Sequence, residues 1–518
     1  MPSDSLESAS RTDLLHRARA ADITGRSSMS KPQLIASLRE RDRSAWDEER
    51  ETRDQRGGEV EGDGRRRVGA RVEAFRRLAE ARARGEMVLL PRMLGGNDRR
   101  THVRETVRED HETRIASGDV EAVEKFDKLA RSVFHFFRGT NLLFYRDVLG
   151  EDARMPTVLG LGDVHPGNFG VMPSSDDVPV FGVNDFDDAF YAPFTWDLKR
   201  GVVGFMLAAA EKSGLGRKKQ RTIAERFVRG YIEGIAAYAT DSTEQDEQLR
   251  LDNAPPMIAD LIGRALRHSR SEWLAATLLD EYGTGFRADD ELVPVSSRRA
   301  EFQALVDRYV RENEVSVPAR AGAMRVKDVA ERKGAGTASL GLTRYFVLIE
   351  GPLADGTDDL VLELKRARRS ALVGLVPPSE FEVDGQGDRI RHAQRVHLVN
   401  GDVFYGSVDL DGHSFMVRER APYRDDISLG SLSPGGWKEY AAICGRVLAH
   451  THAMSDENGL IDYDVEPAIM DAIGGHDLFV DDLVRFAEEA VARVRCDHDH
   501  FVADHALGAF RRVDVVYR

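Results

Sequence analysis

The chain has few of the features of secreted and membrane-spanning proteins. Among 518 residues there are only two cysteines, Cys444 and Cys496, and both fall in segments with helical spacing, which excludes a disulfide framework and favours a reducing compartment. The first residues lack the basic and apolar regions of a signal peptide, and the most conspicuous apolar run, residues 201–210, is too short for a bilayer. We therefore expect a cytoplasmic protein with no membrane partner.

Positive charge is in deficit, with 73 Lys and Arg against 88 Asp and Glu, a net charge of −15. A protein that coats a polyanion is normally basic, so the overall charge argues against tight nonspecific binding to nucleic acid and leaves only local basic patches open. The length predicts several domains or lobes, and the alternation of helical and strand patterns predicts an α+β fold.

The most informative segments are residues 162–169, Gly-Asp-Val-His-Pro-Gly-Asn-Phe, and residues 183–187, Val-Asn-Asp-Phe-Asp. Asn168 follows Asp163 by five residues, and Asp185 follows at the end of a predicted strand. In a kinase-type site one Asp meets the acceptor hydroxyl, while an Asn five residues on and a second Asp hold Mg²⁺. The alternative interpretation is a polar turn between two buried strands.

These segments resemble the catalytic and metal-binding loops of aminoglycoside and choline phosphotransferases, distant relatives of the protein kinases. Residues 136–139, 162–170, 184–189 and 196–200 resemble more closely a bacterial family known only as domain of unknown function 2252, over most of the chain after about residue 85. That second resemblance implies no activity.

The phosphotransferase resemblance implies a role for each acidic residue. Asp163 would orient and deprotonate the acceptor hydroxyl, while Asn168 and Asp185 would bind Mg²⁺. Asp187 would bind a second ion, and Asp197 would brace the catalytic loop.

A second set of candidates lies in the strand-rich segment after residue 325. Gly334, Gly336 and Gly341 form a glycine loop between two predicted strands, and Lys365 ends the strand that follows. Backbone amides of such a loop approach phosphates and a lysine neutralises them, so we expect an ATP site here. The resemblance also implies that the main chain near Glu419 is the hinge that binds adenine.

The order of these parts is reversed relative to a kinase, because the catalytic loops precede the glycine loop and its lysine. Joining the end of the predicted helix near Ser455 to the strand before Gly162 would restore the usual order. We therefore predict a two-lobed, protein-kinase-like fold that is circularly permuted, with a helical catalytic lobe at 71–324, a β-rich nucleotide lobe at 325–420 and helices at 421–518 that complete the helical lobe. The rival interpretation is that residues 334–365 are only a hairpin.

A small helix-loop-helix module is predicted at residues 1–42, followed by a charged disordered linker at 43–70. In the module Ser30 caps the second helix and Pro32 lies in its first turn. Residues 12–39 resemble the N-terminal domain of the transcription termination factor Rho, which implies binding to nucleic acid or to a protein partner; a simple docking appendage is the alternative.

Several other residues depart from the pattern or invite a metal assignment. No helix with an inward glutamate is evident after Lys365, where only Glu380 and Glu382 are candidates, and Leu161 stands where the resembled families often have histidine. Two more sets of side chains could suggest metal ligands: His450 with His452, and Cys496 with His498, His500 and His505. We interpret both sets as ordinary helix residues.

We expect from these patterns an ATP- and Mg²⁺-dependent phosphotransferase acting on a hydroxyl of an unidentified small molecule or protein. One alternative is a nucleotide-binding pseudokinase or regulatory module recruited to a partner by residues 12–39. Another is a nucleotidyl transferase, which uses a similar site with the nucleotide reversed.

Overall fold

The structure is a computed structural model, and it describes Leu14, Ala18 and residues 29–38, 69–86, 90–117, 120–241, 243–333, 342–376, 385–457 and 460–511. The chain divides into two compact units, one of Met1–Arg67 with Val515–Arg518, and one of Val68–Asp514. The predicted linker at 43–70 and the glycine loop at 334–341 lie almost entirely or entirely outside the described residues.

In the first unit, residues 31–38 form a helix, as predicted. The N–H of Ser30 donates to Gln33 Oε1 at 2.8 Å, the return bond of a capping box, so the helix starts where the sequence indicates. Four small apolar side chains form its buried cluster: Leu14, Ala18, Leu34 and Leu38.

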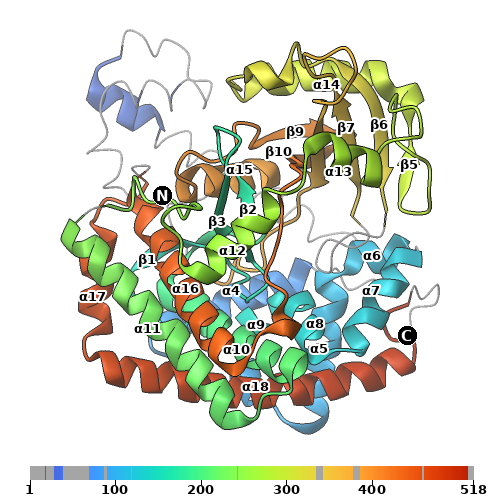
Figure 1. The fold of residues 1–518 in the computed structure, drawn as a ribbon. Helices are drawn as coiled ribbons and strands as arrows, with labels where there is room; N and C mark the ends of the chain where they lie inside the picture. Colours follow the sequence, from blue (N-terminus) through green and yellow to red (C-terminus); the bar gives the residue numbers. More distant parts are fainter. Residues whose placement is uncertain are drawn as a thin grey trace. The chain divides into compact units, whose positions relative to one another are not determined.

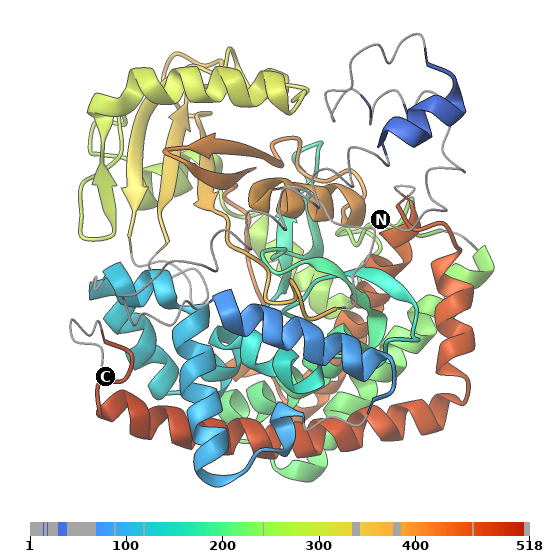
Figure 2. The same ribbon diagram turned by 180° about the vertical axis from the view of Figure 1, so that it is seen from behind.

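The second unit begins with a series of helices that precede residues 157–193, the segment with most of the candidate catalytic residues (Figures 1 and 2). These are α4 (Gly69–Ala83), η2 (Pro91–Met93), α5 (Gly96–Asp110), α6 (Glu112–Ser117), α7 (Val120–Ala130), α8 (Val133–Gly139) and α9 (Asn141–Val148). The aromatic residues of α8 and α9 are buried in the main core.

Four short strands hold the two segments with the candidate catalytic residues. They are β1 (Thr157–Gly160), β2 (Phe169–Pro173), β3 (Pro179–Val183) and β4 (Phe190–Pro193). Strand β1 pairs with β4, and β2 pairs with β3, all antiparallel. Since the loop 161–168 joins β1 to β2 and the loop 184–189 joins β3 to β4, this pairing places the two loops side by side.

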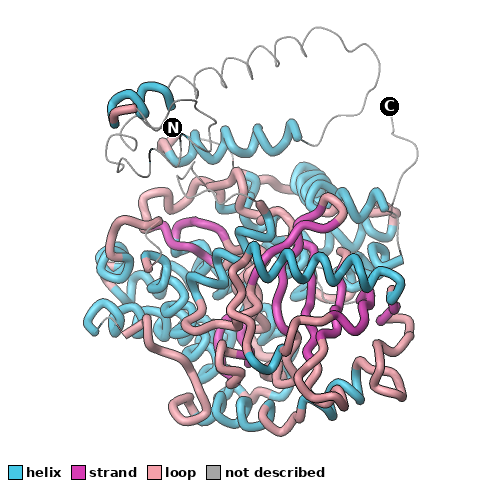
Figure 3. The backbone as a smooth tube through the Cα atoms, turned by 90° about the horizontal axis from the view of Figure 1, so that it is seen from above, coloured by secondary structure: helices cyan, strands magenta, loops and turns pink. Residues whose placement is uncertain are grey.

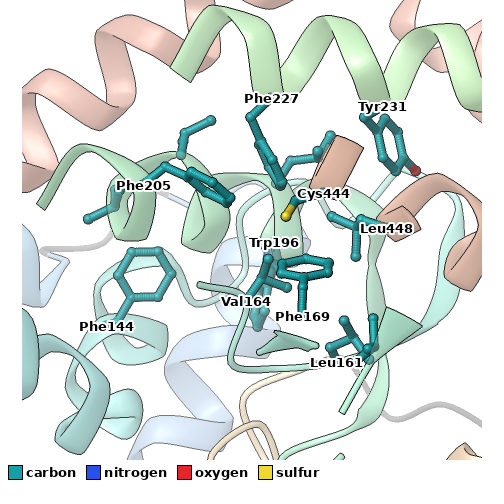
Figure 4. Close-up of a cluster of buried hydrophobic side chains, with 14 of the residues drawn as sticks. Phe144, Leu161, Val164, Phe169, Trp196, Phe205, Phe227, Tyr231, Cys444 and Leu448 are labelled. Atoms are coloured by element: carbon teal, nitrogen blue, oxygen red, sulfur yellow. The ribbon is translucent and has the colours of Figure 1, made fainter. Parts of the chain in front are cut away.

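Helices from both ends of the unit enclose these strands. They are α10 (Phe194–Ser213), α11 (Arg217–Asp241), α12 (Pro256–Ala265), α13 (Arg270–Thr277), α16 (Pro434–Ala453), η6 (Met454–Asp456), α17 (Val465–Ile473) and α18 (His476–Ala506). Helix α10, which contains the apolar run 201–210, is buried along most of its length. Figure 4 shows its Trp196 and Phe205 packed with Cys444 of α16 and with Val164 and Phe169 of the catalytic segment.

The sheet has six antiparallel strands in the order β5-β6-β7-β8-β10-β9. Their bounds are β5 (Leu292–Pro294), β6 (Val326–Arg332), β7 (Arg344–Ile349), β8 (Leu360–Arg366), β9 (Gly406–Leu410) and β10 (His413–Glu419). Between β8 and β9 the chain forms α15 (Gln386–His397), a helix that sequence reasoning missed. Figure 3 shows the strands of this unit in magenta among the helices that surround them.

The two faces of the sheet differ. Helix α14 (Arg299–Glu312) covers one face, where Phe302 and Tyr309 pack against side chains such as Val347 and Leu362. On the other face Leu274 of α13 packs near Leu348 and Val361. Because β5 and α14 belong to this layer, it begins at Leu292 rather than at the residue 325 expected from composition.

Three short 3₁₀ segments complete the described elements, η3 (Ser296–Arg298), η4 (Ala319–Ala321) and η5 (Leu429–Ser431). Across the described ranges, none of the helices combines the length and apolar character that crossing a membrane requires.

Candidate active site

Asp197, in the first turn of α10, holds the main chain of the loop 161–168 through hydrogen bonds. Its carboxylate accepts the N–H of Leu161 at 2.6 Å and that of Gly162 at 3.0 Å, and Nε2 of His452 lies 3.2 Å away. Gly162 has a φ of +71°, and a Cβ there would lie 2.3 Å from the carbonyl oxygen of Asp188. The predicted bracing role of Asp197 is therefore confirmed, and Leu161 contributes its main chain where a histidine side chain was expected.

Asp163 faces a buried arginine that sequence reasoning missed. Arg200 donates to Asp163 Oδ1 from Nη2 at 2.8 Å and from Nε at 3.1 Å, while its guanidinium stacks 3.6 Å above the Phe137 ring. Burial nonetheless raises the pKa of Asp163 to about 6, because desolvation outweighs the attraction of Arg200. A carboxyl group with a pKa near neutrality is well placed to exchange a proton at physiological pH.

Arg138, a charged residue among aromatic side chains, has a histidine as its partner. Its Nε donates to Nε2 of His165 at 2.8 Å, and the same His165 nitrogen lies 3.7 Å from Asp163. Burial, with Arg138 and Arg200 nearby, holds the pKa of His165 well below its usual value, so the ring is neutral and accepts this bond.

Asn168 lies directly above the main chain of Asp163. Its side-chain Nδ2 donates to the main-chain carbonyl of Asp163 at 2.7 Å. Its main-chain carbonyl accepts the N–H of Asn184 at 3.0 Å. The first bond uses the amide nitrogen and leaves the amide oxygen as the acceptor available to a cation. The second bond ties the loop 161–168 to the loop 184–189.

Lys365 of β8 meets the acidic residues of the loop 184–189. Its Nζ contacts Asp187 Oδ2 and lies 3.9 Å from Asp185 Oδ1. Burial disfavours the ionised form of Asp187, but the lysine outweighs burial and keeps the pKa of Asp187 below its usual value. The structure thus brings together Lys365, Asp185 and Asp187 across about 180 residues of sequence.

Helix α15 contacts the same loop through an arginine. Arg389 donates to the carbonyls of Ala189 at 2.6 Å and of Asp187 at 2.7 Å. Its sequence contains no glutamate, so within the described residues no helix provides the glutamate that pairs with the strand lysine in kinases. Glu380 and Glu382 lie outside the described residues.

Asp188 links the loop to the chain that follows β8. It accepts bonds from Asn141 Nδ2 at 3.0 Å and from the N–H of Ala371 at 2.9 Å, and it pairs with Arg368. Neither Asp188 nor Arg368 was singled out in the sequence, although Asp188 directly follows the recognised motif.

The face of the sheet that carries Lys365 also carries an excess of arginine. Glu363, two residues earlier on β8 and fully buried, pairs with Arg418 at 2.6 Å and with Arg344 at 2.9 Å. Arg420 and Arg424 lie close enough to lower the pKa of Glu363 further, yet neither has an ion-pair partner among the residues that the structure describes. Burial and the neighbouring arginines lower the pKa of Arg424 to about 10. One carboxylate among four arginines leaves this face positive.

Glu419 does not present its own N–H or its side chain to this face. Its N–H donates to Asp402 Oδ2 at 2.9 Å, and its buried carboxylate pairs with Arg270 and Arg320, at 2.7 and 2.6 Å. Because this N–H is engaged, it is not free to bind an adenine ring. The chain after Glu419 continues past the β2–β3 hairpin, where Asp426 bridges to Gly170.

The oxygen atoms of Asn168, Asp185 and Asp187 are the hard ligands that Mg²⁺ prefers. The carboxylate of Asp185 is 37% exposed, whereas that of Asp187 is 11% exposed and held by Lys365. The residues therefore fit a metal site in which Asn168 and Asp185 would be the main ligands. Asp187 would be shared between the metal and Lys365. Gly334, Gly336 and Gly341, the predicted phosphate loop, lie outside the described residues.

Most of the histidines that invited a metal assignment have separate partners, whereas His500 Nε2 lies 3.7 Å from Cys496 Sγ. His450 Nε2 lies 2.8 Å from the carbonyl of Glu244, and His452 Nδ1 lies 2.8 Å from the Tyr231 hydroxyl. His498 bonds to the carbonyl of Leu129. Within the described ranges, one group of acidic side chains has metal-like spacing, Asp456, Asp464 and Glu466, in and near η6 and α17.

Comparison with known proteins identifies a family and no activity. Residues 119–504 match the model of the family described as "Uncharacterized protein conserved in bacteria (DUF2252)", so the chain belongs to this family. No curated protein and no solved structure matches the chain. The matched range includes the two loops, Lys365 and the arginine-rich face of the sheet.

Proposed function

We propose that the protein is an ATP- and Mg²⁺-dependent phosphotransferase that acts on a hydroxyl group. The observation that carries the proposal is the contact of Lys365 with Asp185 and Asp187, next to the loop that holds Asp163 and Asn168. Phosphoryl transfer needs little more from a protein than a positioned acceptor, bound metal and positive charge around the phosphates.

The arrangement of strands supports the same proposal. Strands β6, β7 and β8, then helix α15, then β9 and β10 form one antiparallel sheet in which β10 lies between β8 and β9. With the edge strand β5 set aside, Lys365 lies on the third strand of this sheet in chain order, and protein kinases also carry the phosphate-binding lysine on their third strand. The pairing of β1 with β4 and of β2 with β3 likewise suits the strands that flank catalytic and metal loops.

In the proposed mechanism the acceptor hydroxyl lies against Asp163, which takes its proton as the phosphoryl group transfers. Arg200 fixes the orientation of Asp163, and Asp197 fixes the main chain below it. Asn168 and Asp185 would hold Mg²⁺, which supplies charge neutralisation on the phosphates. Lys365, Arg344 and Arg418 provide positive charge on the opposite wall, and the chain from Arg420 onward would contact the base.

A second candidate function is nucleotide binding without turnover. It is favoured by the paired bonds between Arg200 and Asp163, which occupy one oxygen of the proposed base, and by the missing glutamate on α15. Residues 12–39 would then recruit the protein to nucleic acid or a partner. A third candidate, nucleotidyl transfer, would use the same groups with the nucleotide reversed.

The test is incubation of the purified full chain with a metabolite extract, Mg²⁺ and ATP labelled on the γ phosphate, followed by identification of labelled products. We expect γ label to be transferred by the wild type and not by Asp185→Ala. Label transferred only from the α phosphate would indicate nucleotidyl transfer. Stoichiometric ATP binding with no transfer would select the pseudokinase, and no ATP binding would refute the proposal.

A further inference from the structure

A cavity of about 260 Å³ lies beside the β2–β3 hairpin, and none of its lining residues has been given a catalytic or binding role above. Its walls come from β2, β3, the end of α15, α16 and the segment 247–255, and all of its lining residues are described. Seven of them are valine, leucine or isoleucine, and Met172 adds a further apolar side chain. This volume is slightly below the range of about 300 Å³ and more found for ligand pockets, so a small molecule would fill it.

His397 is the polar group of the cavity that lacks a partner. It is 2% exposed, and neither ring nitrogen makes a hydrogen bond of normal geometry within the described part of the chain. Burial lowers the pKa of His397 to about 3, although the main chain of Thr451 opposes the effect slightly, so the ring is neutral. A neutral imidazole has one donor and one acceptor, and leaving both unpaired inside a protein is costly.

The other polar lining groups are already bonded to one another or to main chain. Tyr238 donates to Glu247 at 2.8 Å, Gln248 donates to the carbonyl of Val399, and His450 bonds to Glu244. The cavity also has one cation, Arg446, beside one anion, Glu247. The charges balance, so the cavity favours an uncharged occupant.

The same histidine contacts the metal loop. The ring of His397 stacks on that of Phe186, with centroids 5.9 Å apart and planes at 16°. Phe186 stands between Asp185 and Asp187, and Arg389 on the same helix as His397 holds the main chain of Asp187. An occupant that bonds to His397 would therefore contact a residue that packs directly on the loop with both carboxylates.

We propose that this cavity binds a small, uncharged, mostly apolar molecule with one hydrogen-bond donor and one acceptor, and that this binding changes the position of Phe186 and of the loop 184–189. The second effect rests on the proposed function of Asp185 as a metal ligand. The binding itself does not.

The chain offers a variant that fills the cavity without strain. Gly182 lines it from β3, and a Cβ there would meet only the Met172 methyl group, at 3.5 Å. Valine suits a strand, so Gly182→Val should fold and occlude the space. His397→Phe keeps the stacked ring and removes both nitrogens. Gly95→Val, where a Cβ meets nothing within 4 Å, is the matched control.

The experiment uses indazole, a neutral bicyclic molecule with adjacent donor and acceptor nitrogens, titrated into the full chain and followed by saturation-transfer NMR. We expect saturable binding by the wild type and Gly95→Val, a loss of at least tenfold in affinity for Gly182→Val, and a loss of about 3- to 10-fold for His397→Phe. Equal binding by Gly182→Val and the wild type would overturn the proposal. So would no binding by the wild type together with a crystal structure in which ordered water alone contacts His397.

Transmission to the metal loop is measured by Mn²⁺ titration with and without saturating indazole. We expect the Mn²⁺ affinity of the wild type to change and that of Gly182→Val to stay constant. An unchanged affinity in the wild type would refute the transmission. If the wild type binds no Mn²⁺, the proposed metal function fails, while indazole binding still decides whether the cavity is a ligand site.

Discussion

The main-chain N–H of Leu159 donates to the side-chain oxygen of Ser455 at 3.1 Å, across 296 residues of sequence. Leu159 lies in β1, just before the loop with Asp163, and Ser455 lies in η6, just after α16. The end of α16 thus meets the start of the catalytic segment, which is the junction that a circular permutation would have opened. This contact supports the proposed permutation independently of the contacts between charged residues.

Replacing Ser455 by alanine should lower the free energy of unfolding by about 1 to 3 kcal/mol, because both residues are buried and the Leu159 N–H loses its acceptor. Denaturant unfolding measures the loss, and amide hydrogen exchange should show faster exchange at Leu159. Ser433→Ala, which removes the cap at the other end of α16, is the control and should leave exchange at Leu159 unchanged. Unaltered exchange at Leu159 in Ser455→Ala would contradict the coupling.

Replacing Lys365 by methionine should destabilise the protein by about 3 kcal/mol, because it leaves the Asp187 carboxylate buried without its cation. Asp187→Asn in the same background should restore part of the loss, since the neutral amide needs no counter-charge. A double-mutant cycle by chemical denaturation gives the coupling between the two side chains, expected to exceed about 1 kcal/mol. Strictly additive effects would mean that the pair contributes nothing to stability.

Turnover should depend on pH through Asp163. Its pKa of about 6 means that the carboxylate accepts a proton as the pH falls through 6, so kcat/KM should drop about tenfold per pH unit below that point and level off above it. Asp163→Asn should lower the rate by roughly 10²- to 10⁴-fold and remove the fall of kcat/KM below pH 6. A wild-type profile flat between pH 5 and 8 would exclude Asp163 as the base.

The same pKa has the opposite effect on stability. The folded protein holds a proton on Asp163 at pH values where the unfolded chain, with an ordinary pKa of 3.8, has released it. This group therefore favours the folded state at low pH, and its contribution is lost as the pH rises through about 6.

Deleting residues 1–66 should leave the unit Val68–Asp514 folded, with an unchanged melting temperature and unchanged nucleotide binding, because the two units are separately compact. If residues 12–39 bind nucleic acid, the affinity of the full chain should fall steeply with salt and disappear in the truncated protein. Loss of solubility on truncation would instead make the small unit part of the core.

The local parts of the site were predictable because each has a local signature. The spacing of Asp163 and Asn168, the strand before Asp185 and the lysine at the end of β8 are all readable within a few residues. Helix α15 was missed because it follows a segment with two prolines and has five arginines and histidines among twelve residues, a composition that hides its apolar side. The positions of β5 and α14 in the sheet layer were missed for a similar reason, since composition does not reveal the packing partner.

The long-range partners could not be predicted. Nothing in the sequence near Asp163 indicates that Arg200 would reach back to it from the next helix, or that Glu363 would collect arginines from β7 and β10. Such pairs depend on strand register and helix orientation. Lys365 is the exception, because the shared ATP site predicted it near Asp185 and Asp187, whereas the bond of Arg138 to His165 was not foreseen.

The ion pair between Arg368 and Asp188 joins residues 180 positions apart, with the acidic partner first. On a ribosome that adds about 5 to 20 residues per second, the loop with Asp185, Asp187 and Asp188 emerges some 10 to 35 seconds before the strand and the following chain that bring Lys365 and Arg368. During that interval the three carboxylates have no cation from β8 and stay in water. The loop 184–189 therefore reaches its buried position late in synthesis, and nascent chains that end before residue 365 should remain open to proteases there.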